Sequence, residues 1–313
     1  MRVLHFSSEL KPAGRKVCLA IGFFDGVHLG HQQIIRQTIS DARQHEAISV
    51  VITFDCHPNT IVAPDHVPPL IYSLPQKLRT IESMGTDVLL LLHFDREFSM
   101  QSGETFVRRL AADFGQIQSI CVGANFTFGH KRSGNVALLQ KLSEELRFNV
   151  HGMAAVSLDD KPVSSTRIRD AIMRGDLDAA SQMLGRAYSL AGQVVPGDRL
   201  GHQLGFPTAN LDVAGLALPP NGVYAAHVKI IGERSGGRHG YRSVVNIGVR
   251  PSVSQPTPQR RVEAHLLSFT GELYSHELEL TFVEKLRDEQ KFPSLDDLRA
   301  QIARDIERAQ SLF

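Results

Sequence analysis

The sequence predicts a chain of two parts, an α/β domain with a parallel sheet followed by an all-β domain. At roughly 100–200 residues per domain, the length of 313 residues indicates two domains. Short apolar runs alternate with longer amphipathic stretches up to Gly185, and beyond it short strand-like runs are separated by loops rich in Gly, Pro and Asn. The composition, with 42% apolar and 21% charged residues, is that of an ordinary globular protein with a large core.

In the first part, the apolar and β-branched runs predict strands that are buried on both faces. These runs are Val17–Gly22, Ala47–Phe54, Asp87–Leu92 and Ile117–Gly123. Helical spacing of apolar residues predicts helices at His31–His45, Pro75–Met84, Gly103–Phe114, Asn135–Phe148, Ser165–Arg174 and Leu177–Leu184. Strands that alternate with helices favour a parallel sheet with right-handed crossovers.

The second part is expected to be an antiparallel barrel or sandwich. Its predicted strands are Tyr188–Val195, Tyr224–Ile230, Arg242–Asn246, Val262–Phe269 and Glu277–Val283. The amphipathic segment Leu295–Ala309 predicts a closing helix, for which Ser294 is a suitable N-cap. We place the domain boundary after residue 187, which gives domains of residues 1–187 and 188–313.

Charge and cysteine usage narrow the class of partner. The formal net charge of +1 argues against nucleic acid, because counterion release needs a strongly basic surface. The longest apolar runs fall short of the ~20 residues of a membrane-spanning helix, and the first residues lack the apolar stretch of a secretory signal. The cysteines are widely spaced without a CxxC pair, which fits a reducing cytoplasm and offers no zinc framework; they are Cys18, Cys56 and Cys121. These observations favour small-molecule substrates over nucleic acid or membrane, and they leave a homo-oligomer open.

The first candidate site follows the first strand. His28 and His31 are separated by Leu-Gly at an expected helix start, where two imidazoles and the helix N-terminus can bind one anion. A second anion cradle is expected at Ser164-Ser165-Thr166, which opens a later helix with Arg169 one turn in. Taken singly, the first pattern also fits half-buried polar residues at a strand end, and the second also fits a helix cap.

The second candidate site is a glycine-rich loop followed by Pro207-Thr208-Ala209-Asn210. The glycines at 197, 201 and 205 fit a loop whose N–H groups wrap phosphates, or an ordinary barrel corner. Thr208 and Asn210 present a hydroxyl and an amide oxygen on one face of an extended strand, and such hard oxygen ligands suit Mg²⁺.

Together these motifs resemble those of the bacterial bifunctional riboflavin kinase/FAD synthetase family, over about Val17 to Ala309 and in the family's order. The first half carries the HxGH and SSTxxR signatures of the nucleotidylyltransferase superfamily. Matching segments there are Ile21 to His31, Thr53 to Pro58 (with Cys56 where the family has proline), Gly123 to Gly129 and Ser164 to Arg169. In the second half they are Pro207 to Asn210, Pro220 to Tyr224, Asn246 to Ser252, Val262 to Leu266 and Leu286 to Phe292. His202 stands where the family commonly has arginine.

The resemblance implies a Rossmann-like nucleotidylyltransferase domain followed by a six-stranded antiparallel β-barrel of the riboflavin kinase type with a terminal helix. It implies Mg²⁺- and ATP-dependent phosphorylation of riboflavin to FMN. The phosphate of FMN then attacks the α-phosphorus of a second ATP, which gives FAD and pyrophosphate. The nucleophile comes from the substrate, so catalysis is positioning and charge stabilisation.

The resemblance also implies roles for individual residues. In the adenylyltransferase it assigns ATP to Gly22, Phe24, Gly26, His28, His31, Ser164, Ser165, Thr166 and Arg169, with His28, His31 and Arg169 catalytic. It assigns flavin there to Asn125, His57 and Phe128. In the kinase it assigns ATP to Gly197, Gly201, Gly205, Pro207 and Thr208, flavin to Asn246 and Arg287, Mg²⁺ to Thr208 and Asn210, and the general base to Glu263.

Three alternatives stay open at this point. One is an enzyme with a single activity, in which His202 weakens the kinase half. Another is a flavin-binding regulator that has kept the fold and lost the chemistry, although such a binder would not require both sets of catalytic residues. A third is cytidylyl transfer to a small phosphate, which explains the HxGH motif and leaves the second half unexplained.

Overall fold

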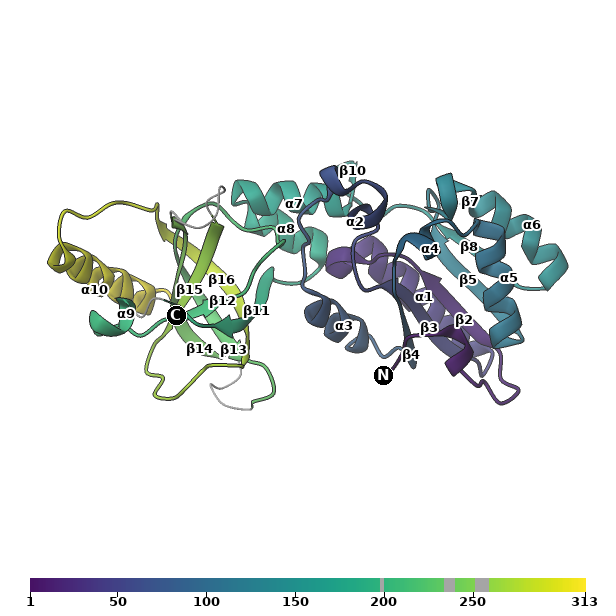
Figure 1. Ribbon diagram of the computed structural model, residues 1–313, viewed down its shortest axis with the longest axis horizontal. Coiled ribbons are helices and arrows are strands. Elements are labelled where there is room, and N and C mark those ends of the chain that lie inside the picture. The colour runs from purple at the N-terminus through teal and green to yellow at the C-terminus, as the bar shows by residue number, and fades with distance from the viewer. Residues whose placement is uncertain (198–199, 234–239, 251–258) are drawn as a thin grey trace. The chain divides into compact units, whose positions relative to one another are not determined.

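The computed structural model describes residues 1–197, 200–233, 240–250 and 259–313 (Figure 1). They form two compact units, Met1–Arg167 and Ile168–Phe313. The division falls within a helix, 20 residues before the domain boundary that the sequence suggests. The boundary at 187/188 itself stays a prediction.

The first unit is built on a six-stranded sheet, in which all neighbouring strands are parallel, with the order β1-β4-β3-β2-β5-β8. The strands are β1 (Arg2–Leu4), β2 (Val17–Ile21), β3 (Ile48–Phe54), β4 (Val88–Leu92), β5 (Ile117–Gly123) and β8 (Asn149–Met153). The four predicted strands are confirmed. The two edge strands were not predicted, because β1 has only three residues and β8 contains no continuous apolar run.

Helices cover this sheet and begin at the kinds of residue that cap helices. They are α1 (Leu29–Gln44), α2 (Asn59–Val62), α3 (Leu74–Glu82), α4 (Arg96–Ser99), α5 (Gly103–Phe114) and α6 (Val136–Leu146). Ser73, Ser102 and Asn135 each accept a backbone N–H at the start of α3, α5 and α6. Short pairs of strands, β6 (Thr127–Phe128) with β7 (Gly134–Asn135) and β9 (Ser157–Leu158) with β10 (Lys161–Pro162), lie in the connections.

The helices α7 (Ser165–Arg174) and α8 (Leu177–Leu184) have the predicted bounds. Gly175 has a φ of +83°, which a residue with a side chain rarely adopts, and Asp176 accepts the N–H of Ala179 as the N-cap of α8. Gly175 therefore ends α7, and Asp176 begins α8.

The second unit contains a closed antiparallel barrel of six strands with the order β11-β12-β15-β14-β13-β16. They are β11 (Ser189–Val195), β12 (Ala209–Leu211), β13 (Gly222–Ile230), β14 (Tyr241–Arg250), β15 (Gln259–Leu266) and β16 (Glu277–Arg287), and a short helix α9 (Leu200–Gln203) precedes β12. The terminal helix α10 (Leu295–Ser311) begins after Ser294, whose side chain accepts the N–H of Asp297 as predicted.

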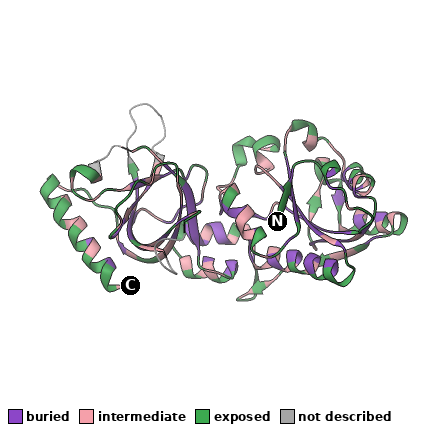
Figure 2. Ribbon diagram, turned by 90° about the horizontal axis from the view of Figure 1, so that it is seen from below, coloured by how far each residue is buried: buried purple, intermediate pink, exposed green. Residues whose placement is uncertain are grey.

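Each unit has its own apolar core. Figure 2 shows buried residues concentrated along the strands, with exposed residues on the outer helix faces. The barrel is filled by residues such as Leu190, Val245 and Leu278, while Val223, Val244 and Ala309 pack outside it under α10. Among the described residues, no helix is long and apolar enough to cross a membrane.

Candidate active sites

The loop that follows β2 contains several residues with positive φ angles, and contacts with Ile71 hold this conformation in place. Phe24, Gly26 and Val27 have φ angles of +56°, +71° and +41°, and a positive φ is rare for a β-branched residue. A Cβ on Gly26 would lie 2.9 Å from the side chain of Ile71. The Asp25 carboxylate accepts the backbone N–H of Ile71 at 3.0 and 3.1 Å. Strained loops of this kind are found where a functional group must be aimed.

This loop delivers His28 and His31 to the start of α1. Their rings stack with centroids 3.5 Å apart, and His28 Nδ1 accepts the N–H of His31 at 3.4 Å. The pKa of His31 lies well below its usual value, because burial disfavours the charged ring and because His28 and Lys77 are nearby. Within the described part of the chain, His31 Nδ1 is buried without a hydrogen-bond partner. Two imidazoles beside a helix N-terminus, one with an unpartnered nitrogen, are groups that can hydrogen-bond a ligand, and an anion is the ligand that the sequence predicts here.

The second predicted anion cradle lies against this loop. Ser165 Oγ donates to the backbone carbonyl of Asp25 at 3.2 Å, so the two motifs, 140 residues apart, meet within the first unit. Ser164 Oγ accepts the N–H of Arg167 at 3.3 Å, and Thr166 is exposed. Arg169 is buried on α7, one turn beyond Ser165.

The residues expected to contact flavin in the first unit differ in their exposure and packing. The His57 ring packs edge-on against Phe23 with centroids 4.8 Å apart, and Asn125 is exposed. Phe128 is partly buried and packs against the core, where it stacks on Phe126 at 5.3 Å and leaves no room for a Cβ on Gly134. A flavin contact for these three residues stays a prediction. At residue 22 the local packing requires a glycine, because a Cβ there would lie 2.8 Å from the ring of Phe24.

The structure adds one residue that the sequence did not single out. Lys77 on α3 is 4% exposed, and its ammonium donates to the carbonyls of Phe54 (2.9 Å) and Phe23 (3.3 Å) and to Thr53 Oγ1 (3.3 Å). It also lies 4.4 Å from the centroid of the Phe23 ring. Lys77 therefore places a positive charge behind the loop that carries the histidines. A lysine on an amphipathic helix resembles many surface lysines, so sequence alone had no signal for it.

Burial lowers the pKa of Lys77 to about 8. The ammonium is charged below this pH and neutral above it, so we expect the FAD formation that the resemblance implies to fall as the pH rises through about 8. In Lys77→Met, FAD formation should be weaker throughout, and this alkaline decline should be absent. The measurement is FAD formation from FMN and ATP against pH, with the FMN formation that the resemblance also implies as the internal control. A decline of the same midpoint in Lys77→Met would show that another group is responsible.

The second candidate site lies on the outer surface of the barrel. Asn210 on β12 is in register with Glu263 on β15, which is in register with Asn246 on β14. Side chains of residues directly opposite each other share one face of a sheet. Their neighbours Ala209, Ala264 and Val245 fill the barrel, so the row of Asn210, Glu263 and Asn246 faces outward.

Two cavities meet at this row. One of about 420 Å³ is lined by Gly197, His202, Pro207, Thr208 and Asn210. The other, of about 310 Å³, is lined by Gly201, Thr208, Asn210, Asn246, Glu263 and Arg287. Thr208 and Asn210 thus line both cavities. With the exception of Gly205, the structure brings together all the residues predicted for the kinase site, on the walls of these two cavities.

Two of the glycines are required by close approach. A Cβ on Gly197 would lie 2.1 Å from Asn210 Nδ2, and a Cβ on Gly201 would lie 3.0 Å from Thr208 Oγ1. The loop therefore lies directly over the two predicted metal ligands. Gly205 has a φ of +86° with open space around it, which is a turn position. Pro251 and Ser252 of the matched segment lie outside the described residues.

The cavity of about 310 Å³ also contains residues that the sequence did not single out. His265 follows Glu263 by two residues on β15 and so shares its face; its Nδ1 donates to the carbonyl of Pro207 at 2.7 Å. This contact holds the segment just before β12, which carries Pro207 and Thr208. Strand alternation around Glu263 was the signal that could have found it. Asp305 of α10 is the second such residue. It is buried and forms an ion pair of 2.8 Å with Arg287, which was predicted for the flavin, and this pair holds the helix at the cavity.

Comparison with known proteins gives a consistent result. A family model described as FAD synthetase matches residues 10–167, and one described as Riboflavin kinase matches residues 184–313. A protein of Haemophilus influenzae named "Bifunctional riboflavin kinase/FMN adenylyltransferase" is 35% identical over 94% of each chain. One of the same name from Escherichia coli K12 is 34% identical over 100% of this chain and 98% of its own.

A solved structure shares the overall fold. It is described as a macrolide-efflux protein from Streptococcus pneumoniae, and it matches with a TM-score of 0.81 and 26% identity over 99% of each chain. The match over the whole length is consistent with the succession of a parallel α/β unit and a closed barrel found here.

Proposed function

This chain belongs to the family of bifunctional riboflavin kinase/FMN adenylyltransferases, and we propose that each of its two candidate sites carries one of the family's activities. The protein phosphorylates riboflavin to FMN with ATP, and it transfers an adenylyl group from a second ATP to FMN, which gives FAD and pyrophosphate. Riboflavin, FMN and ATP are its small-molecule substrates. The domain boundary that separates the two activities is proposed to lie after residue 187.

For adenylyl transfer, the proposal assigns the ATP phosphates to His28, His31, Ser164, Ser165, Thr166 and Arg169. The observation that supports it is the stacked pair of His28 and His31 beside the start of α1, with the buried Nδ1 of His31 unpartnered among the described residues. The lowered pKa of His31 means that its imidazole is neutral at physiological pH. It can therefore donate one N–H to a phosphate oxygen, and its protonation state stays the same as charge develops on the phosphates during the reaction.

For phosphorylation, the proposal assigns Glu263 as general base toward the ribityl 5′-hydroxyl. It is the only carboxylate in the row of Asn210, Glu263 and Asn246, so its oxygens face the same cavity as both amides. Asn246 and Arg287 are proposed for the flavin, and Gly197, Gly201, Gly205, Pro207 and Thr208 for ATP. A base must lie within hydrogen-bond reach of the proton that it accepts.

Thr208 and Asn210 are the proposed Mg²⁺ ligands. Their hydroxyl and amide oxygens are hard donors, and both residues border both cavities, which fits an ion that contacts the phosphates of ATP. Mg²⁺ supplies neutralisation of phosphate charge when it is bound. Two oxygen ligands are few enough to leave coordination positions for water and substrate.

One assay tests the two activities together. Purified protein is incubated with riboflavin, ATP and Mg²⁺, and FMN and FAD are separated over time. We expect FMN to appear first and then to convert to FAD. No flavin product at all would favour a binding regulator, and FAD formed only from added FMN would favour an enzyme with the single adenylyltransferase activity.

His202 offers a sharper test of the kinase half. It lines the cavity of about 420 Å³, where an arginine would hold phosphate through two parallel charged hydrogen bonds. We expect His202→Arg to lower the KM for ATP in FMN formation roughly tenfold, equivalent to about 1.4 kcal/mol. The control is His276→Arg, which makes the same substitution at a histidine outside this cavity, whose Nε2 lies 3.3 Å from Glu233 Oε1. An equal effect in both variants would indicate a general charge effect.

The proposal also places the protein in the cytoplasm. Cys18, Cys56 and Cys121 are all free thiols, which fits a reducing compartment.

A further inference from the structure

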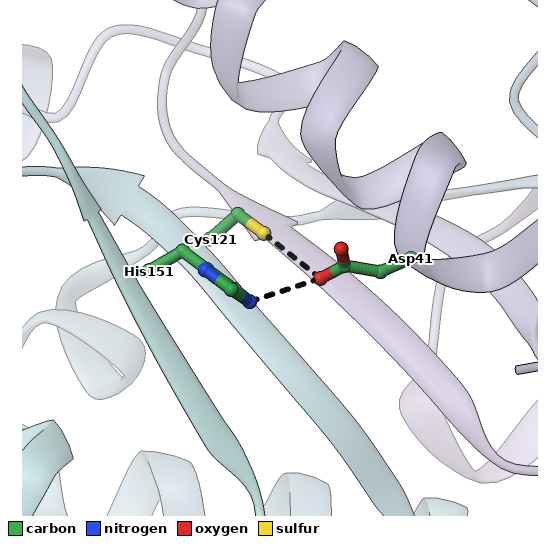
Figure 3. Close-up of side chains that lie close together, drawn as sticks. All are labelled: Asp41, Cys121 and His151. Carbon is green, nitrogen blue, oxygen red and sulfur yellow. Dashed lines mark hydrogen bonds and ion pairs between the residues drawn. The ribbon is translucent and has the colours of Figure 1, made fainter. Parts of the chain in front are cut away.

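A cluster of three side chains in the first unit lies apart from the adenylyl site. Asp41 comes from α1, Cys121 from β5 and His151 from β8 (Figure 3). Asp41 Oδ2 lies 3.2 Å from His151 Nε2 and 3.9 Å from Cys121 Sγ, and all three donor atoms lie within 4.8 Å of one another. Asp41 is 13 residues beyond His28, which at 1.5 Å per residue places the cluster about 20 Å along α1 from that site.

These donors and separations match the ligand set of a borderline-soft divalent cation. A tetrahedral Zn²⁺ bound by sulfur at about 2.3 Å and by nitrogen and oxygen at about 2.0–2.2 Å keeps its ligand atoms about 3.3–3.6 Å apart. The separations of 3.2 and 3.9 Å from Asp41 Oδ2 bracket that range, and the other two donor atoms lie no more than 4.8 Å apart. We propose that Asp41, Cys121 and His151 form a binding site for Zn²⁺ or a cation of similar softness, distinct from the Mg²⁺ site of the kinase.

A bound dication would change the protonation of the cluster, because a coordinated thiol loses its proton. Binding would release one thiol proton and move the imidazole proton from Nε2 to Nδ1. One thiolate and one carboxylate then neutralise the two charges of the ion in a buried place.

The surroundings orient the donors. Gln37 Nε2 donates to Asp41 Oδ1 at 2.7 Å, and Ser119 Oγ donates to Asp41 Oδ2 at 2.6 Å. Partners of this kind fix a ligating carboxylate and tune its affinity. Asp41 and Cys121 are buried, whereas the side chain of His151 is 37% exposed, so the cluster meets solvent at the imidazole.

The sequence offered no zinc framework because the three ligands are 80 and 30 residues apart. Parallel pairing in register sets Cys121 directly beside His151, and α1 crosses the same face of the sheet. The strand β8 is at the edge of that sheet. A bound ion would therefore tie the edge strand to the central strand β5 and to α1, and would stabilise the folded first unit in proportion to its occupancy.

The test uses the full-length protein, treated with a chelator and then placed in excess Mg²⁺ so that oxygen sites are filled. Titration with Co²⁺ should give one equivalent with a thiolate-to-cobalt charge-transfer band, and Zn²⁺ should displace it and raise the melting temperature. Cys121→Ser and His151→Gln should each weaken binding at least about 100-fold. Cys56→Ser removes a part-buried thiol elsewhere and should leave binding unchanged.

FMN and FAD formation in the chelated protein shows that each variant is folded, because neither Cys121 nor His151 belongs to the proposed machinery. His151→Gln is the safer variant, since its side chain is partly exposed. Two results would overturn the site: a chelated wild-type protein that binds no stoichiometric Co²⁺ or Zn²⁺, or a thiolate band that persists in Cys121→Ser. Either result would identify the cluster as a hydrogen-bond network around Asp41.

Discussion

The variant His28→Ala should lose FAD formation almost completely while it continues to convert riboflavin to FMN. His28 stacks on His31 at 3.5 Å and accepts its N–H, so the substitution removes one phosphate donor and releases the other ring. Removal of one well-placed donor of this kind costs about 3–4 kcal/mol of transition-state stabilisation, or about 100- to 1,000-fold in rate. The measurement is FAD formation from FMN and ATP, with FMN formation from riboflavin assayed on the same preparation.

The same histidine also caps α1, so a structural effect must be separated from a chemical one. Loss of a cap costs about 0.5–2 kcal/mol of stability. His28→Asn keeps a side-chain acceptor at the cap and lacks the imidazole, so it should melt like the wild type and still be inactive in FAD formation. His45→Ala, at the exposed C-terminal end of α1, is the matched control. Normal FAD formation by both His28 variants would remove His28 from the site.

The variant Glu263→Gln should have the opposite profile, with FMN formation strongly reduced and FAD formation from added FMN unchanged. The substitution keeps the size of the side chain between Asn210 and Asn246 and removes its ability to accept a proton. General base catalysis contributes about 100- to 10,000-fold, and the loss should appear in kcat. Riboflavin affinity, followed by flavin fluorescence, should be nearly unchanged because the cavity keeps its shape.

A matched control is available on the same unit. Glu307→Gln makes the same chemical change on the exposed side of α10 and should leave both activities intact. If Glu263→Gln turned over riboflavin at a near-normal rate, the base would have to be sought elsewhere in the cavity. If it lost riboflavin binding as well, Glu263 would be a binding residue and not the base.

The sequence predicts the core strands and main helices because apolar periodicity is a local property. It misses β8, because the residues of that strand are partly or fully exposed and show no apolar run. It also misses β12 as a separate strand, because three residues are too few to show an alternation of apolar and polar side chains. The order of the strands is likewise set by pairings between distant segments, which no local pattern contains.

For the sites, the motif residues could be predicted because their spacing along the chain is itself the signal. Lys77 could not, since its role depends on contacts with the carbonyls of Phe23 and Phe54, which lie 54 and 23 residues before it in the chain. His265 could have been predicted from strand alternation. The contact of Ser165 with Asp25, which unites two motifs, becomes visible only in three dimensions.

The strand that carries Asn210, β12, has the weakest strand pairing in the barrel, which is its pairing with β11. β12 has three residues, and it joins β11 through only two register pairs, Val194 with Leu211 and Val195 with Asn210. The remaining pairs join β12 to the strand of Glu263. The cavity of about 420 Å³ is lined by Val194 and Val195 of β11 together with Asn210 of β12, so a ligand bound there would contact both strands of this pair. Substrate binding and closure of the barrel therefore share contacts, and in the protein without substrate we expect backbone hydrogen exchange to be fastest at β12.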